Sequence, residues 1–239
     1  MRRQDQQQAY DRGSAMYSPD GRIYQVEYAH EAVSQGAPSV GVRTAEGVVL
    51  AVSRRVRSDL LVGESIEKLH KIDDHVGIAT TGHVADGRKL VEYARQRAQL
   101  SRLRFEEPIT VEELTKALTD EIQQFTQTGG TRPFGVSLLV AGVDDGTPAL
   151  FEADPSGNPT AWRGRAVGEG ASAAQEFIED RYEEDLSLDD GVALALDALR
   201  ETGPDTALSP DTVGVATVGV EDGRFTRLSE DAVADYLGD

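Results

Sequence analysis

Apolar residues along the chain follow two periods, one typical of helices and the other typical of strands. Val26, Ala29 and Val33 recur at helical spacing and predict a helix at about 23–35. The next two runs, 39–43 and 47–53, are rich in β-branched residues. They predict a β-hairpin with apolar side chains on both faces, and therefore a sheet that is covered on both sides.

The rest of the chain continues this alternation of groups of strands with pairs of helices. The patterns predict strands at 76–81, 136–143, 149–153, 160–167, 213–220 and 224–228, and helices at 84–100, 111–125, 171–182, 188–200 and at the C-terminus. Each strand group has apolar residues for two faces, whereas each helix has one apolar stripe. The order therefore predicts one α+β domain, a four-layer αββα sandwich in which two antiparallel sheets are stacked between layers of helices.

Charge narrows the classes of partner. The chain of 239 residues has 42 acidic and 24 basic residues, a formal net charge of -18, and only four lysines. This excess of carboxylates disfavours binding to nucleic acid or to anionic membranes. It is typical of proteins adapted to high salt, although an ordinary acidic protein is an alternative. The polar residues 1–9 and the lack of a long apolar run predict a soluble, cytoplasmic protein.

Several motifs resemble those of one family. Residues 10–12 and 17–29 are similar to the N-terminal signature of α-type subunits of the archaeal proteasome core particle. The similarity continues through 65–69, 81–86, 129–137 and 154–157. The resemblance implies a particle of four stacked seven-membered rings, with α-type rings outside and β-type protease rings inside. Other α-type chains, β-type chains and unfolded protein substrates would then be the partners.

The same resemblance assigns a gate to the N-terminus. Residues 1–9 would form a flexible segment over the axial pore, ahead of a single α-type domain at 10–239. The residues that match the family's gate positions are Tyr10, Asp11, Arg12, Pro19 and Tyr28. Taken singly, a polar terminus followed by a Pro-Asp-Gly turn also occurs in unrelated proteins.

A second set of residues matches the family's docking pocket for an activating ATPase. Lys68 matches a lysine that pairs with the C-terminal carboxylate of the ATPase, and a point charge on a flexible stem suits that task. Gly82 and His83 match the same pocket, although leucine is common in the family where His83 stands. The alternative is that Lys68 is a solvated lysine pairing with Glu64 and that Gly82 is a turn glycine.

The sequence argues against a catalytic role for this chain. The related β-type chains use an N-terminal threonine, and its position falls at about Ala37, which has neither a hydroxyl nor a free amine. The acidic partner position falls at about Ser53, so Lys68 alone survives. No cofactor is expected, the histidines lack metal-ligand spacing, and the glycines at 168–173 are interpreted as a helix start. The alternative is an N-terminal-nucleophile amidohydrolase activated by processing.

Overall fold

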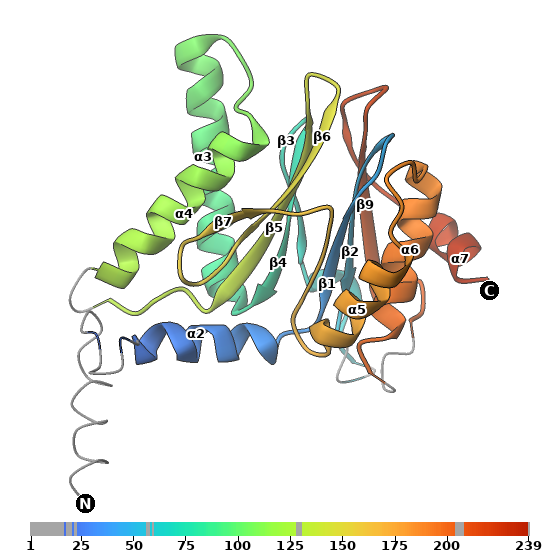
Figure 1. The fold of residues 1–239 in the computed structure, drawn as a ribbon, viewed down its shortest axis with the longest axis horizontal. Helices are drawn as coiled ribbons and strands as arrows, with labels where there is room; N and C mark the ends of the chain where they lie inside the picture. Colours follow the sequence, from blue (N-terminus) through green and yellow to red (C-terminus); the bar gives the residue numbers. More distant parts are fainter. Residues whose placement is uncertain are drawn as a thin grey trace, which may run out of the picture.

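The computed structural model describes residues 17, 21, 23–55, 58, 60–127, 131–203 and 208–238. Residues 1–9 and the expected gate residues Tyr10, Asp11, Arg12 and Pro19 lie outside the described residues. Four layers are visible edge-on in Figure 1, in the order helices, sheet, sheet, helices. This arrangement confirms the predicted αββα sandwich.

Two five-stranded antiparallel sheets form the inner layers of the described chain. The first has the order β10-β9-β2-β1-β8, and the second has the order β3-β4-β5-β6-β7. The first sheet comprises β1 (Ser39–Arg43), β2 (Gly47–Ser53), β8 (Gly164–Val167), β9 (Val213–Gly219) and β10 (Phe225–Arg227). The second comprises β3 (Leu69–Asp73), β4 (Val76–Gly82), β5 (Val136–Asp144), β6 (Thr147–Ala153) and β7 (Pro159–Ala161).

The helices lie outside the sheets. Figure 1 shows α3 (Val84–Phe105) and α4 (Val111–Gln127) on the side of the second sheet, and α5 (Ala171–Arg181), α6 (Leu188–Arg200) and α7 (Glu230–Leu237) on the side of the first. The first described helix, α2 (Tyr24–Ser34), runs across the end of the sandwich instead of covering a face. A 3-10 turn, η1 (Gly63–Ser65), precedes β3. The end crossed by α2 is where the candidate site lies.

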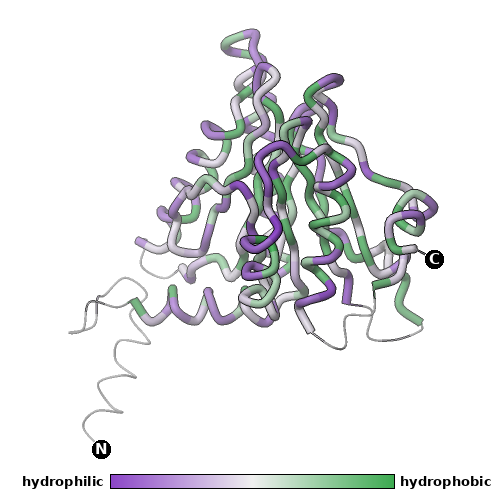
Figure 2. Tube along the Cα trace, turned by 45° about the vertical axis from the view of Figure 1, so that its right-hand side comes forward, coloured by the Kyte–Doolittle hydropathy of each residue, from purple (hydrophilic) through white to green (hydrophobic). Residues whose placement is uncertain are grey.

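Three apolar clusters stabilise the sandwich. One lies between α3, α4 and the second sheet, and includes Leu90, Leu114 and Leu138. Another lies between the two sheets, and a third lies between the first sheet and helices α5 to α7. In Figure 2 the apolar colour concentrates along the central strands. Because both faces of each sheet are buried, the central strands read as continuous apolar runs, which made them recognisable in the sequence.

Most predicted elements are confirmed, and two predictions need correction. The hairpin of β1 and β2 and the helix at 188–200 have the expected bounds. The single strand expected at 160–167 is wrong, because the chain leaves one sheet after β7 and enters the other at β8. Strand β3 was not predicted. Its buried residues include His70, a polar residue that is only 4% exposed, so the apolar signal is weak.

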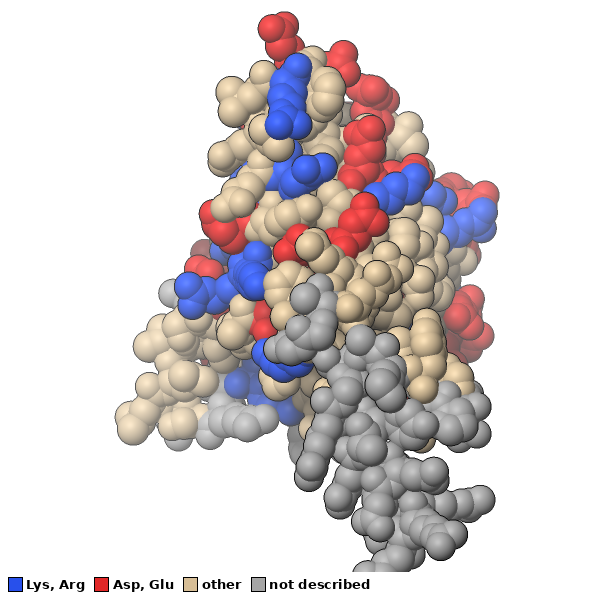
Figure 3. All heavy atoms as spheres, turned by 90° about the vertical axis from the view of Figure 1, so that its left-hand side faces the viewer, with Lys and Arg blue, Asp and Glu red and all other residues tan. Residues whose placement is uncertain are grey.

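The surface carries charges of both signs. On the face shown in Figure 3, acidic and basic side chains are interspersed instead of gathered into one basic patch. No helix within the described residues is long and apolar enough to cross a membrane.

Candidate functional site

The candidate site surrounds residues 36–38, which connect the end of α2 to the start of β1. Gly36 closes the helix with its N–H, which donates to the carbonyl oxygen of Val33 at 2.9 Å. A Cβ at Gly36 would lie 2.8 Å from the backbone nitrogen of Gly82, so no larger residue fits without a shift. The turn is therefore packed tightly against the end of β4 and brings the two sheets together at this end.

Lys68, just before β3, reaches into this turn. The residue is only 8% exposed, and its Nζ donates to the carbonyl oxygens of Ala37 at 2.6 Å and Pro38 at 2.9 Å. A third hydrogen bond goes to the carbonyl oxygen of Ser53, at the end of β2, at 3.0 Å. Three acceptors match the three donors of an ammonium group. The alternative of a solvated lysine is therefore wrong.

The charge of Lys68 is bonded to neutral acceptors. Within the described chain no carboxylate lies at ion-pair distance from its Nζ, which is bonded to carbonyl oxygens only. Burial, reinforced by the neighbouring positive charge of Arg55, lowers the pKa of Lys68 to about 7. The three carbonyl dipoles favour the ammonium form and oppose this shift. An incoming carboxylate would supply the missing negative charge and raise the pKa.

Gly82 and His83 lie at the end of β4, next to the same turn. Gly82 has a φ of +120°, and a Cβ there would lie 2.3 Å from the carbonyl oxygen of Gly135, so glycine is required. The backbone N–H of His83 donates to that same oxygen at 2.8 Å, while the side chain is exposed. The structure thus places Gly82 and Lys68 against one turn, with His83 at the surface beside them.

A buried carboxylate that was not predicted organises the neighbouring surface. Asp86, in the first turn of α3, accepts two hydrogen bonds from Arg132 at 2.6 and 2.8 Å and one from the backbone N–H of Gly135 at 2.9 Å. Burial raises the pKa of Asp86, but the bonds from Arg132 and Gly135 outweigh this effect and leave the pKa below its ordinary value. Both Asp86 and Arg132 lie in the motif stretches 81–86 and 129–137, which was the available signal.

The positions that correspond to a nucleophile site do lie together. Lys68 bonds the carbonyl oxygens of Ala37 and Ser53, the two positions identified from the sequence as nucleophile and acidic partner. Ala37 offers a methyl group within a continuous chain, and the contacts of both residues with Lys68 are made by the backbone. The two positions expected for a nucleophile and its acidic partner therefore contribute backbone oxygens to the contacts with Lys68.

Two further motifs are explained by packing. Ser137 is 1% exposed in β5 and donates to Glu152 at 3.0 Å. The glycines at 168–173 precede α5 as expected, and the preceding strand β8 pairs antiparallel with β1, unlike a dinucleotide-binding unit. Among the described residues no group of three or more potential metal ligands is found. Tyr28 lies on α2 with half of its surface exposed, and it is the one expected gate residue whose position is described.

Comparison with known proteins gives a consistent result along the whole chain. Residues 33–218 match the family described as "Proteasome subunit", and residues 10–32 match the N-terminal signature of the A-type proteasome subunits. The proteasome alpha subunit of Halobacterium salinarum is 57% identical over 239 residues, which covers all of this chain and 94% of that protein. The proteasome alpha subunit 1 of Haloferax volcanii is 55% identical, covering 99% of this chain and 94% of its own length. The proteasome alpha subunit 1 of Haloarcula marismortui is 53% identical over 239 residues, covering all of this chain and 92% of its own length.

Proposed function

We propose that this chain, which belongs to the proteasome α-subunit family, is a non-catalytic subunit of the outer ring of a proteasome core particle. In this role it assembles with other α-type chains into a seven-membered ring, and with β-type chains, in the cytoplasm. Its N-terminus gates the entry of unfolded protein substrates, and its surface docks an activating ATPase. The β-type chains carry out the peptide hydrolysis.

The Lys68 site is the observation that carries the non-catalytic part of this proposal. A proteolytic chain of this fold needs a threonine with a free amine at the start of the first strand. Here that position is Ala37, a helix and its connecting turn precede the strand, and the lysine is bonded to backbone carbonyls. The lysine is therefore present without the threonine nucleophile and the acidic partner that accompany it in a proteolytic chain.

The same cation supports the docking part. Among the described residues Lys68 has three carbonyl contacts and no carboxylate contact, so the site offers a positive charge that an incoming C-terminal carboxylate can neutralise. Gly82 keeps backbone close to the turn, and His83 provides an exposed side chain beside it. Each of the three residues matches the docking pocket that the family resemblance implies.

Support for the gate comes from the sequence. The N-terminal signature of α-type subunits matches residues 10–32, and this range includes Tyr10, Asp11, Arg12, Pro19 and Tyr28. Helix α2 crosses the end of the sandwich, so the signature enters the described fold at that end and not among the strands. We assign residues 1–9 to the segment that covers the pore.

Reconstitution with a β-type chain tests the proposal. The native mass and the hydrolysis of a fluorogenic peptide are measured in high salt for each chain alone and for the mixture. We expect a large particle that is active only when both chains are present. Peptidase activity of this chain alone, with a newly exposed Ser or Thr terminus, would instead establish the amidohydrolase alternative.

The gate is tested in the same particle by removing residues 1–9. Deletion of the segment should speed peptide hydrolysis without changing the native mass, because substrate no longer waits for the pore to open. A matched control replaces residues 1–9 by a Gly/Ser segment of the same length. It shows whether the gate depends on the sequence of the segment or only on its length. An unchanged rate after deletion would mean that residues 1–9 do not restrict substrate entry.

A further inference from the structure

The sandwich has two open sides, at which edge strands of both sheets lie together. On one side the second sheet ends at β3 and the first at β10, and β3 lies near β9. On the opposite side the second sheet ends at β7 and the first at β8. Both sides carry a hollow, and the charges that line the two hollows differ in sign.

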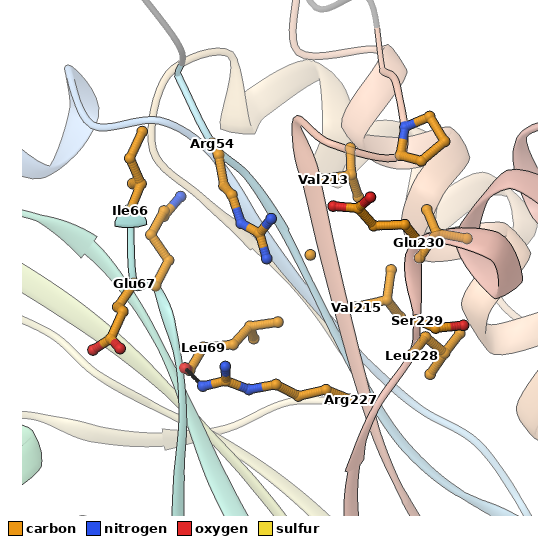
Figure 4. A pocket seen from close by; sticks show the side chains of 14 residues that line it. Arg54, Ile66, Glu67, Leu69, Val213, Val215, Arg227, Leu228, Ser229 and Glu230 are labelled. Atoms are coloured by element: carbon orange, nitrogen blue, oxygen red, sulfur yellow. Dashed lines mark hydrogen bonds between the residues drawn. The ribbon is translucent and has the colours of Figure 1, made fainter. Parts of the chain in front are cut away.

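The side with β3 and β10, called here the basic side, has a cavity of about 350 Å³. Its cationic lining residues are Arg54, Lys68 and Arg227. In Figure 4 the guanidinium groups of Arg54 and Arg227 approach the cavity from opposite walls. Of the two lining carboxylates, Glu67 points away from Arg54, whereas Glu230 enters from the side of α7. Cations thus outnumber carboxylates around this cavity.

Neither arginine of the basic side has an acidic partner within the part of the chain that is described. Arg227 donates to the carbonyl oxygen of Leu69, and Arg54 donates weakly to that of Asp211 at 3.5 Å. No described carboxylate lies at ion-pair distance from either guanidinium. In a chain with a net charge of -18, two arginines that line one cavity without a described carboxylate partner are unusual.

The opposite side, called here the acidic side, has a hollow of about 670 Å³ between α2, α5, the edge strand β8 and residues of β5 and β6. Its one arginine, Arg165, is already neutralised by Glu152, whose Oε2 lies 2.7 Å from the Nε of Arg165. Two further carboxylates of the lining, Glu176 and Glu179, are exposed on α5. The Oε1 of Glu179 accepts a hydrogen bond from Gln175, and no described cation pairs with either carboxylate.

We propose that the basic side of one chain packs against the acidic side of the next copy, so that Arg54 and Arg227 face Glu176 and Glu179 across the interface. The inference rests on the proposed ring assembly and specifies its direction. A ring of identical chains needs two different, complementary surfaces on each chain, because every copy contacts its two neighbours head to tail. The two open sides lie at opposite edges of the same sheets and have opposite charge.

We expect these charges to determine the direction and register in which neighbouring chains pack, more than the affinity between them. At molar salt the Debye length is about 3 Å, so charges that stay solvent-exposed are almost fully screened. Pairs that become desolvated in an interface are screened much less, and like charges placed there cost several kcal/mol. The same arrangement disfavours contact of two basic sides or two acidic sides, and therefore disfavours head-to-head dimers that cannot close a ring.

Charge reversal tests the inference on the full chain. The variants are Arg54→Glu, Glu176→Arg and the combination of both, with Asp120→Arg on the exposed face of α4 as a control for any reversal of charge. Sedimentation measures association in high salt, and thermal unfolding of each variant shows that the fold is retained. We expect each single reversal to weaken association by about tenfold or more, the control to leave it unchanged, and the combination to restore it.

An equimolar mixture of the two single variants provides a second readout. The glutamate introduced at position 54 of one variant then faces the arginine introduced at position 176 of the other, and so the mixture should associate more strongly than either variant does alone. If the wild-type chain associates and both single reversals associate equally well, the inference is overturned while the ring proposal stands. If the wild-type chain fails to associate at any salt concentration, the ring proposal itself fails and the inference fails with it.

Discussion

Lys68 and Asp86 are two buried charges near the same end of the sandwich, and the chain satisfies them in different ways. Asp86 receives a bidentate arginine and a backbone N–H, so its charge is compensated within the fold. Lys68 receives three carbonyl dipoles and, within the part of the chain that the structure describes, no carboxylate. A compensated charge serves structure, whereas an uncompensated buried cation costs stability and leaves the site attractive to an anion from outside.

The largest expected effect follows from the uncompensated charge. Replacing Lys68 by Met keeps most of the buried volume and removes the cation, so stimulation of peptide hydrolysis by an activating ATPase should be lost. The rate of the reconstituted particle is measured with and without the ATPase, and the native mass shows that rings still form. Lys116→Met, which removes an exposed lysine, is the control.

Retained stimulation in Lys68→Met particles would contradict the docking role. Lys68 and Asp86 would then both be buried charges with a structural role only. Lys68→Ala is a poorer test than Lys68→Met. Both variants remove the donor that Lys68 supplies to the carbonyl oxygens, but Lys68→Ala also opens a cavity, so lost stimulation could follow from a damaged turn.

The second prediction concerns the pH dependence of stability. The pKa of Lys68 is lowered from 10.5 to about 7 in the folded chain. Between these values the unfolded chain holds one more proton, so the free energy of unfolding rises with pH in this window and is flat below it. Relative to Lys68→Met, the wild-type chain should gain about 3 kcal/mol between pH 7 and about pH 9.5, measured by urea unfolding at constant salt.

Parallel curves for the wild-type chain and Lys68→Met would mean that the three carbonyls hold the lysine protonated throughout this range. The Lys116→Met variant again serves as control, because that lysine is exposed and pairs with Glu112 at the helix surface. It should follow the wild-type curve. The outcome measures how well carbonyl dipoles alone stabilise the charged form of Lys68 in the absence of a carboxylate.

The third prediction tests the compensated charge. Asp86→Asn should lower the free energy of unfolding by about 2 kcal/mol at neutral pH, because it breaks the bidentate pair and leaves buried groups imperfectly bonded. Since the pKa of Asp86 is lowered in the fold, its contribution is present above the ordinary value of 3.8 and is lost as pH falls. The two unfolding curves should therefore converge in acid.

Arg132→Gln is the matched variant for this prediction. The side chain of Arg132 is 62% exposed, so it can be rehydrated when its partner is removed, and its own replacement leaves Asp86 bonded to Gly135. We expect a loss smaller than that of Asp86→Asn, about 1 kcal/mol. Equal stability of all three chains at neutral pH would show that the pair is a surface contact without structural value.

Some features of the fold and of the site could be predicted from the sequence, whereas the burial of these two charges could not. Strands such as β5 and helices such as α6 follow from period and length, because their faces are buried uniformly. The motif match identified Lys68 and its neighbours. It did not identify the burial of Lys68, because lysine is rarely buried and its three acceptors come from two segments 15 to 31 residues away in the chain.

Long-range pairing explains what was missed. Asp86 and Arg132 lie 46 residues apart and meet only because β5 runs beside β4. The crossing from β7 to β8 was equally hidden, since both short strands read as one β-rich run while belonging to different sheets. A period reports which face of an element is buried, but it carries no information about which partner covers that face.

The smallest expected effect concerns His83, which connects the two charges. Its carbonyl oxygen accepts the backbone N–H of Asp86 at 3.1 Å, and its exposed side chain lies beside Gly82. His83→Leu should change the free energy of unfolding by less than about 0.5 kcal/mol, because the backbone contacts remain and the side chain is at the surface. The ATPase concentration that gives half-maximal stimulation should shift by a few-fold, because the side chain borders the turn at 36–38 that we propose as part of the docking site. A variant that loses stability without any shift in this concentration would place His83 with Asp86 as a structural residue, and would confine docking to Lys68.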